Sequence, residues 1–377
     1  MNTTNEHVKK LTYCKKCLMP HTRPRISFNA DGICNACEWS EEKNKTDWKE
    51  RWRKLELLCN KYRERNNRRF DVIVPYSGGK NGAYIAYTLR EKLGMHPLCI
   101  TVRPPMEDPI GYQNIRNFVD RGFDHIMITP NRLVERAIDK DNFVNKGIPM
   151  HAWMIAVQTV IFKCTVIFDI PFVMFAEEGE TEYGGSAKLK YQDDYDVSDS
   201  ISIYLSGVDP HRYLTQFTEK ELYWFLFPSK DELLRLEPKI CHWSYFEDFV
   251  NYKHYLVAKD KVGLIERPER NIGTYDNFST NDTQLIWLYY YLMYLKFGFG
   301  RAASEVGNDI RRGALTRKQG INLVKKYDGE FPEKHIPDYL SYYDMTREQF
   351  DAVIDKWANK DLFEKVEARW VPKFEVY

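Results

Sequence analysis

Short apolar runs alternate with amphipathic stretches through the first half of the chain. Four of these runs predict short strands, at 71–76, 97–102, 125–129 and 171–176. Between them, apolar residues recur at three- and four-residue spacing and predict helices over 81–93, 111–120, 132–145 and 151–168. Strand–helix alternation is typical of βαβ crossovers, so the predicted fold class is α/β, with a parallel, Rossmann-like sheet covered by helices. Ligands of such sheets bind at the carboxyl ends of the strands.

The two ends of the chain follow other patterns. Beyond about residue 215 the strand signals fade, and aromatic-rich helical patterns follow at 282–296, 317–326 and 347–357. Such aromatic stripes fit a packed core better than a ligand-stacking surface. We therefore expect three parts, which are a small N-terminal module at 1–45, an α/β domain at 46–215 and a mainly helical region at 216–377.

Composition narrows the class of protein. The 377 residues carry 55 Lys+Arg and 54 Asp+Glu, a formal net charge of +1, which argues against a protein built to coat nucleic acid or an anionic membrane. The apolar run at 285–295 is too short to span a bilayer, and residues 1–10 lack the apolar core of a secretion signal. A cytoplasmic protein is the expectation. The basic stretch 43–69 is either a solvated helix face or a docking surface for an acidic partner or RNA.

Four of the eight cysteines form two pairs with the spacing of a metal site. Two residues separate Cys14 from Cys17 and Cys34 from Cys37, and sixteen residues lie between the pairs. Two such pairs can complete a tetrahedron of thiolates around one ion, so we interpret them as a structural zinc site that stabilises a small segment. Disulfide bonds and an iron–sulfur cluster are the alternatives that the residues leave open.

The loop directly after the first predicted strand has the composition of an anion site. It consists of Ser77, Gly78, Gly79, Lys80, Asn81 and Gly82, and it leads into the predicted helix 81–93. Glycines permit a tight turn and let backbone amides approach an anion, and the positive end of the helix dipole favours a phosphate there. A serine hydroxyl and a lysine add a donor and a charge suited to a polyphosphate. The spacing of the Walker loop is absent, so we predict a different kind of nucleotide-binding loop.

The loop resembles the PP-loop of ATP pyrophosphatases, whose usual form is SGGxDS. That family cleaves ATP between its α and β phosphates and transfers AMP to a carbonyl oxygen. Two positions depart from the pattern, because Asn81 stands where Asp is usual and Gly82 where Ser is usual. Asn81 loses a negative charge that could steer Mg²⁺, and Gly82 loses a hydroxyl. A catalytically impaired ATP-binding homologue is therefore one alternative.

Further motifs lie at 13–24, 28–37, 182–185, 273–278, 296–301, 310–317 and 326–332. Together and in this order, over roughly 13–335, they are similar to one branch, the bacterial N-acetyl sugar amidotransferases of surface-polysaccharide and flagellar glycan biosynthesis. Members convert an acetamido group of a sugar, such as a nucleotide-linked uronic acid or pseudaminic acid, to an acetamidino group. The resemblance implies an O-adenylyl imidate that ammonia attacks, with ATP and Mg²⁺ as cofactors.

The resemblance also implies roles for individual residues. Residues 77–82 would bind ATP, and the catalytic residues would be Lys80, Asn81 and Glu178. Glu178 belongs to an acidic group, with Glu177, Glu180 and Glu182, that follows the strand at 171–176 and could equally be a solvated loop. The substrate contacts would be Glu182, Tyr183, Gly184, Gly185, Thr274, Tyr275, Asn277 and Arg311.

The source of ammonia is the last expectation. Asn2 occupies the position of the N-terminal cysteine nucleophile of one glutaminase class, and no cysteine lies in the nucleophile elbow of the other. We therefore expect a separate glutaminase subunit, which by family resemblance is similar to the glutaminase–cyclase pair of histidine biosynthesis. The rival class is a tRNA-modifying PP-loop enzyme whose cysteine module and stretch 43–69 bind RNA, although the low net charge makes a nucleic-acid partner the weaker reading.

Overall fold

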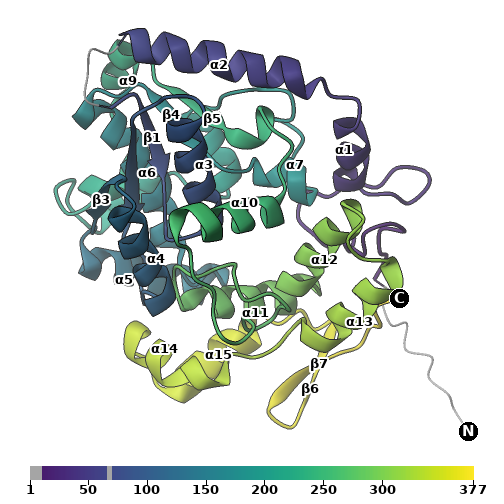
Figure 1. The fold of residues 1–377 in the computed structure, drawn as a ribbon. Coiled ribbons are helices and arrows are strands. Elements are labelled where there is room, and N and C mark those ends of the chain that lie inside the picture. Colours follow the sequence, from purple (N-terminus) through teal and green to yellow (C-terminus); the bar gives the residue numbers. More distant parts are fainter. Residues whose placement is uncertain (1–10, 66–69) are drawn as a thin grey trace, which may run out of the picture.

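The computed structural model describes residues 11–65 and 70–377. Residues 1–10, where a secretion signal was judged absent, and residues 66–69 of the basic stretch lie outside the described part. A five-stranded parallel sheet forms the centre, in the order β3-β2-β1-β4-β5 (Figure 1). Its strands are β1 Val72–Pro75, β2 Pro97–Val102, β3 Asp124–Ile128, β4 Phe172–Phe175 and β5 Lys239–His242. The predicted α/β fold class and the four predicted strands are confirmed.

Strand β5 was not predicted. It pairs in parallel with β4, with Val173 opposite Ile240 and Met174 opposite Cys241. The sheet therefore includes a strand from the region that was expected to be helical. The expectation that strands end near residue 215 is wrong at this point, because β5 has four residues and follows Pro238, too short a run for a period-two pattern.

Helices cover both faces of the sheet. On one face, Ile73, Leu98 and Ile100 pack with α5 (Arg132–Lys146) and α6 (His151–Phe168). On the other face, Val72 and Val74 pack with α2 (Trp48–Arg65), α3 (Lys80–Glu91), α4 (Pro109–Asp120) and α10 (Asn251–Val257). Neighbouring residues of β1 thus enter different cores, as the pleat of a strand requires.

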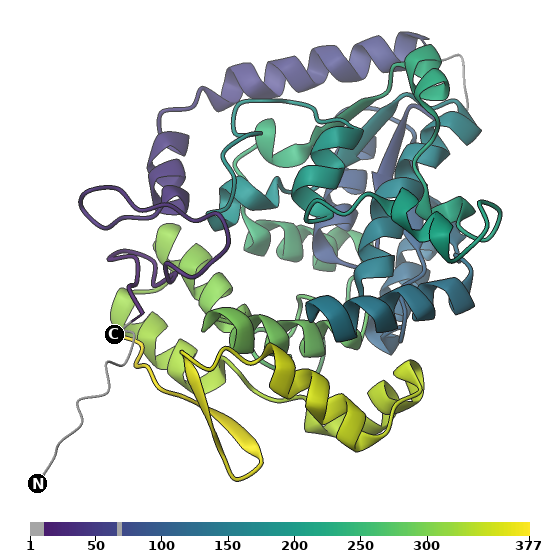
Figure 2. The same cartoon turned by 180° about the vertical axis from the view of Figure 1, so that it is seen from behind.

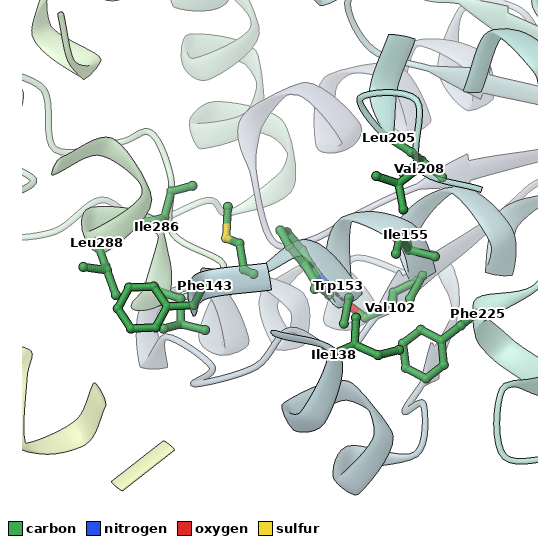
Figure 3. Packing of buried hydrophobic residues seen from close by; sticks show 14 of the residues in the cluster. Val102, Ile138, Phe143, Trp153, Ile155, Leu205, Val208, Phe225, Ile286 and Leu288 are labelled. Carbon is green, nitrogen blue, oxygen red and sulfur yellow. Dashed lines mark hydrogen bonds between the residues drawn. The ribbon is translucent and has the colours of Figure 1, made fainter. Parts of the chain in front are cut away.

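Helix α6 is, within the described part of the chain, the helix whose length and composition would allow it to cross a membrane. Most of it is buried in this structure, and Trp153 and Ile155 pack against Val102, Ile138 and neighbouring residues (Figure 3). In this structure α6 is therefore a buried core helix that packs on one face of the sheet. The sequence predicts this helix at 151–168, but it judges only the shorter run 285–295 against the thickness of a bilayer.

The C-terminal region is mainly helical, as predicted, and ends in a hairpin (Figure 2). Its helices and strands are α11 Leu285–Phe297, α12 Arg301–Arg311, α13 Arg317–Tyr327, α14 Ile336–Tyr343, α15 Arg347–Trp357, β6 Phe363–Val366 and β7 Arg369–Pro372. The remaining helices are short and lie in the first two thirds of the chain: α1 Asn35–Lys43, α7 Gly179–Tyr183, α8 Val197–Asp199 and α9 Lys230–Leu236. The N-terminal module packs on α12 and α13 through Cys17, Leu18 and Val306, so it is joined to the C-terminal region.

Candidate functional site

The glycine loop lies between the end of β1 and the start of α3. Gly78 has φ +87°, and a Cβ on it would lie 2.4 Å from the carbonyl oxygen of Gly111. Both facts require glycine, because an L side chain is strained there and would collide with the start of α4. Gly79 is the N-cap of α3 and gives it no side-chain cap. The first amides of this twelve-residue helix therefore remain available to an anion.

Lys80 opens α3 beside these amides and is only 8% exposed. Its Nζ donates to Ser279 Oγ at 3.2 Å, and no described carboxylate forms an ion pair with it. Burial lowers the pKa of Lys80, while the negative charges of Asp276, Glu177 and Glu305 oppose that shift. A buried ammonium with no ion-pair partner next to a helix N-terminus favours a bound polyanion.

Asn81 connects the loop to two elements that are distant in sequence. Its Nδ2 donates to Glu177 Oε2 at 3.2 Å, and its Oδ1 lies 3.1 Å from His254 Nδ1 on α10. Glu177 follows β4, the neighbour of β1 in the sheet. The departure from Asp at position 81 thus replaces a charge with an amide that bonds to a carboxylate.

Close packing between α3 and β1 explains why position 82 is a glycine. A Cβ at this position would lie 2.8 Å from the carbonyl oxygen of Pro75 and 3.0 Å from the ring of Tyr76. The serine that is usual in PP-loops would need α3 to move away from β1. The glycine is therefore a consequence of how tightly this helix packs on its strand.

Glu178 and Glu177 are adjacent but have different surroundings. Glu178 is the N-cap of α7, and its carboxylate accepts from the amides of Glu180 and Thr181 at 3.2 and 2.8 Å. Burial raises the pKa of Glu178, and these hydrogen bonds partly offset that effect. The prediction that Glu178 is the catalytic acid stays untested, and the carboxylate that contacts the loop is that of Glu177.

A cavity of about 730 Å³ lies next to the loop. Its lining residues come from α1, from α7, from the segment that precedes and begins α10, from residues 275–279 and from α12. The residues that predictions placed in a substrate site and that line it are Glu182, Tyr183, Tyr275, Asn277 and Arg311. Because Ser279 both lines the cavity and binds Lys80, the cavity and the loop form one site.

Charged pairs fill part of the cavity wall. Arg301 Nε donates to Glu305 Oε1 at 2.7 Å, and Glu305 also accepts from Thr274. Burial raises the pKa of Glu305 to about 7, which the charge of Arg301 partly opposes. Thr274 itself is fully buried and supports the wall from behind. A carboxyl group that titrates near neutral pH in a cavity has the property of an acid–base group.

The paired glycines 184 and 185 hold the N-terminal module in place. A Cβ on Gly184 would lie 3.2 Å from the Cβ of Ala36, and Asn35 Nδ2 donates to the carbonyl oxygen of Gly185 at 2.8 Å. The close approach that these glycines permit is therefore that of α1. Neither glycine lines the cavity. The sequence predicts that they contact substrate, but in this structure they contact the N-terminal module.

Arg311 links the module to the cavity. Its Nη2 donates to the carbonyl oxygen of Glu182 at 3.1 Å and to Asn308, while its buried Nη1 has no hydrogen-bond partner among residues 11–65 and 70–377. Burial works to lower the pKa of Arg311, but the negative charges of Cys17 and the neighbouring thiolates raise it on balance. Arg311 thus lies between the cysteine cluster and the cavity.

The four paired cysteines converge. Their Sγ atoms lie within 4.8 Å of one another, with Cys14 and Cys37 at 3.8 Å and Cys17 and Cys34 at 3.4 Å, and all four thiols are free and buried. A zinc ion at about 2.3 Å from each of four tetrahedral thiolates would separate them by about 3.8 Å. The donor set therefore fits one ion, and the spacing leaves no room for a multi-iron cluster between the thiolates. The disulfide alternative is not what this structure contains.

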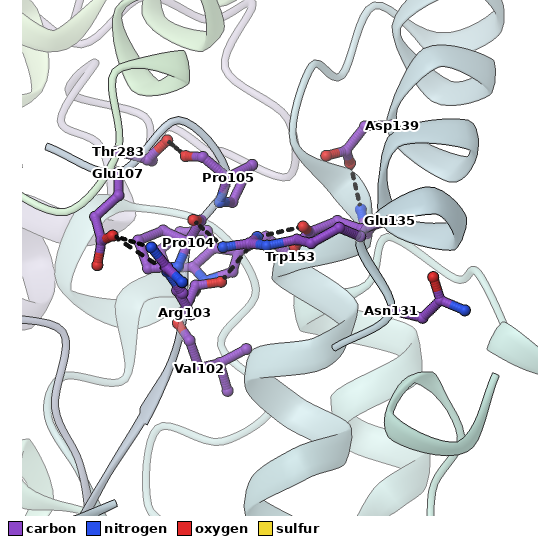
Figure 4. Close-up of polar contacts among 12 residues, drawn as sticks. Val102, Arg103, Pro104, Pro105, Glu107, Asn131, Glu135, Asp139, Trp153 and Thr283 are labelled. Carbon is purple, nitrogen blue, oxygen red and sulfur yellow. Dashed lines mark hydrogen bonds and ion pairs between the residues drawn. The ribbon is translucent and has the colours of Figure 1, made fainter. Parts of the chain in front are cut away.

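Polar contacts hold the segment that follows β2. Like the glycine loop, this segment lies at the carboxyl edge of the sheet. Arg132 donates to the carbonyl oxygens of Arg103 and Pro104 at 3.2 and 2.9 Å, and Thr283 donates to that of Pro105 at 2.5 Å (Figure 4). Residues before and around α11 therefore cover the carboxyl ends of the strands. Gly111 is part of this contact, because a Cβ there would lie 1.9 Å from the carbonyl oxygen of Asn281.

Several residues of the site were not predicted. They are Lys43, Asp276, Ser279, His254, Arg301 and Glu305, and they come from segments far from the loop in sequence. Asp276 and Arg301 lay in segments that the family resemblance had marked, at 273–278 and 296–301. The others have no local spacing that could have indicated them.

The structure defines an α/β protein with a glycine loop at the carboxyl edge of a parallel sheet. Residues 272–375 match the family of the LPS biosynthesis protein WbpG-like C-terminal domain. No curated protein matches the chain. This matched segment includes residues 275–279 and α12, which form part of the cavity wall.

Two solved structures are similar over half of the chain. The NH3-dependent NAD synthetase from Campylobacter jejuni subsp. jejuni NCTC 11168, in complex with the nitrate ion, has a TM-score of 0.30 and 12% identity, over 51% of this chain and 92% of its own. The predicted subunit of tRNA methyltransferase from Methanocaldococcus jannaschii DSM has a TM-score of 0.26 and 16% identity, over 50% and 74%.

Proposed function

We propose that this protein is an ATP-dependent enzyme of bacterial surface-glycan biosynthesis, and specifically an amidotransferase that converts an acetamido group of a sugar to an acetamidino group. The observation that carries the proposal is Lys80, a buried ammonium at the N-terminus of α3 that forms no ion pair with any described residue and lies next to a cavity of about 730 Å³. The match of residues 272–375 to a domain of an LPS biosynthesis protein supports the glycan substrate. The sequence motifs of the amidotransferase family support the reaction.

The reaction would proceed in two steps. The acetamido oxygen attacks the α-phosphorus of ATP, the bond between the α-phosphorus and its bridging oxygen breaks, and pyrophosphate leaves. Ammonia then attacks the imidate carbon, and AMP leaves with the former acetamido oxygen. Adenylylation is needed because an amide oxygen is a poor leaving group. Lys80 and the amides of the loop would neutralise the departing pyrophosphate, and Glu305, which lines the cavity, would accept a proton from the incoming nitrogen.

Two metals belong to this proposal. Zinc would bind to Cys14, Cys17, Cys34 and Cys37 and stabilise the module that forms one wall of the cavity. Magnesium would accompany ATP and supply charge neutralisation of its phosphates. The carboxylates of Glu177 and Asp276, which lie close enough to oppose the pKa shift of Lys80, are oxygen ligands of the kind that magnesium takes.

Ammonia would come from a separate glutaminase subunit. The four cysteines outside the cluster are all buried, and burial raises the pKa of the Cys59, Cys99, Cys164 and Cys241 thiols, which makes them poor nucleophiles. An enzyme that uses ATP and a nucleotide-activated sugar would work in the cytoplasm, where both are made.

The test combines the protein with ATP, Mg²⁺, ammonium and nucleotide-linked acetamido sugars. We expect sugar-dependent AMP, and a product lighter than the sugar by the difference between O and NH. AMP formation that depends on tRNA would contradict the proposal in favour of RNA modification. Tight ATP binding without AMP from any of the sugars would contradict it in favour of an inactive homologue.

A further inference from the structure

The hydrogen-bond partners of Asn81 explain why position 81 is not an aspartate. In the usual PP-loop this position carries a carboxylate, and here it carries the amide of Asn81. The amide nitrogen donates to Glu177 Oε2 at 3.2 Å. A carboxylate is thus present within hydrogen-bond distance of position 81, but it belongs to the residue that follows the neighbouring strand, two residues after β4 ends.

His254 fixes which way the Asn81 amide points. The imidazole is stacked on Tyr84 with ring centroids 4.0 Å apart and an interplanar angle of 11°. Burial, together with the charges of Lys80 and Lys253, holds the pKa of His254 well below its usual range, so the ring is neutral at neutral pH. Its Nδ1–H is assigned as the donor to Asn81 Oδ1 at 3.1 Å. The NH₂ group of Asn81 therefore has to face Glu177.

Glu177 has a free charge at this edge of the sheet. No described lysine or arginine forms an ion pair with it, and its second oxygen accepts only a long hydrogen bond of 3.5 Å from the hydroxyl of Tyr183. Its charge is close enough to Lys80 to oppose the lowering of that lysine's pKa. Tyr183 lines the cavity, so Glu177 lies between the phosphate loop and the substrate cavity.

We propose that Glu177 replaces the aspartate of the usual PP-loop as the carboxylate that binds the Mg²⁺ of ATP, and that Asn81 is the residue that positions it. The inference rests on the proposed use of ATP. An aspartate at position 81 would place two carboxylates face to face at about the separation of this hydrogen bond, and like charges that close cannot both ionise freely. Position 81 and its hydrogen-bond partner therefore hold one carboxylate between them, on the residue two positions after β4 and not in the loop.

Four proteins test whether the metal-binding carboxylate belongs to Glu177 and not to position 81. They are wild type, Glu177→Gln, Asn81→Asp and the double variant Asn81→Asp/Glu177→Gln. The first measurement is the binding of Mn²⁺, as a spectroscopic substitute for Mg²⁺, in the presence of a non-hydrolysable ATP analogue. Loss of the carboxylate in Glu177→Gln should weaken Mn²⁺ binding by at least about tenfold. The double variant, which has its single carboxylate in the loop, should recover most of that loss.

The second measurement is thermal unfolding without metal or nucleotide. Asn81→Asp should lower the melting temperature, since it pairs two carboxylates, and the double variant should return toward wild type. Unchanged Mn²⁺ binding in Glu177→Gln, or an Asn81→Asp protein as stable as wild type, would overturn the inference. If Glu177→Gln does not fold, Glu177→Ser replaces it, because it also removes the carboxylate, and unchanged Mn²⁺ binding there has the same meaning. Sugar-dependent AMP formation is measured separately, so a failure of the proposed reaction leaves these binding results interpretable.

Discussion

The glycine loop and the cysteine module lie on two sides of one site and are built in different ways. Helix α1 of the module lines the cavity, and the loop is connected to it through Ser279. The loop depends on backbone geometry, because Gly78 needs a positive φ and a close approach to Gly111, and the surrounding sheet holds it in place. The module has one regular helix, α1, and its fold is closed by four thiols within 4.8 Å of one another. The comparison teaches that the loop depends on the main core for its shape, whereas the module depends on its four thiols and, in the proposal, on the metal that they would bind.

Removal of the metal should give the largest effect. A Cys34→Ser protein should lose its zinc and, with it, the free energy of about 10–16 kcal/mol that structural zinc contributes to small modules. Hydrogen exchange should then become fast at amides such as Lys15, which donates to Gly32 O at 3.0 Å, and stay slow in β1. Cys59→Ala, which removes a buried thiol outside the cluster, is the control and should keep its zinc. Equal loss of protection in the sheet would show that the two regions do not fold separately.

Gly78→Ala should disrupt the other side of the site, the glycine loop. The positive φ costs about 1–2 kcal/mol for an L residue, and the contact with Gly111 O adds to it, so we expect a loss of about 3 kcal/mol or more and no ATP binding. Gly122→Ala is the matched control, because Gly122 has φ +78° with nothing within 4 Å of a Cβ. Urea unfolding and nucleotide binding measure both variants. Equal losses of stability would mean that the contact with α4 is unimportant.

Lys80→Met should affect the loop without disturbing either side of the site. Hydrogen bonds to charged groups contribute about 1.5–3 kcal/mol, so the affinity for an ATP analogue should fall by about tenfold to a hundredfold. Stability should change little or increase, since a buried charge without an ion-pair partner is removed. Calorimetric titration gives the affinity, and Lys92→Met, at an exposed position after α3, is the control. Unchanged affinity in Lys80→Met would remove the central support for a phosphate site.

The smallest expected effect is a loss of stability of the sheet at acid pH. Burial lowers the pKa of His242, at the end of β5, from 6.5 to about 3. The unfolded chain therefore binds a proton between these values that the folded chain does not, and the sheet loses stability as the pH falls below 6.5. Between pH 7.5 and 5.5 the loss should be about 1.4 kcal/mol greater in wild type than in His242→Gln. An equal loss in both proteins would assign the acid sensitivity to other groups, such as the thiolates of the module.

The two regions also differ in what the sequence could predict. The loop and the cysteine pairs are local sequence patterns. The structure places the loop between β1 and α3 and brings the four paired cysteines together. Glu177 and Glu178 are neighbours in sequence, and which of them faces the loop depends on the helix that Glu178 caps, which no spacing shows. In the same way Gly184 and Gly185 have the composition of a ligand site but contact α1, because packing between distant segments decides their role.

The route of one oxygen atom tests the central claim most directly. A nucleotide-linked sugar whose acetamido oxygen is the heavy isotope is incubated with the protein, ATP, Mg²⁺ and ammonium, and the AMP is analysed by mass spectrometry. The proposed reaction transfers that oxygen to the phosphate of AMP, so AMP should carry the label in proportion to the product formed. Unlabelled AMP, with the heavy oxygen still in the sugar, would contradict adenylylation of the acetamido group.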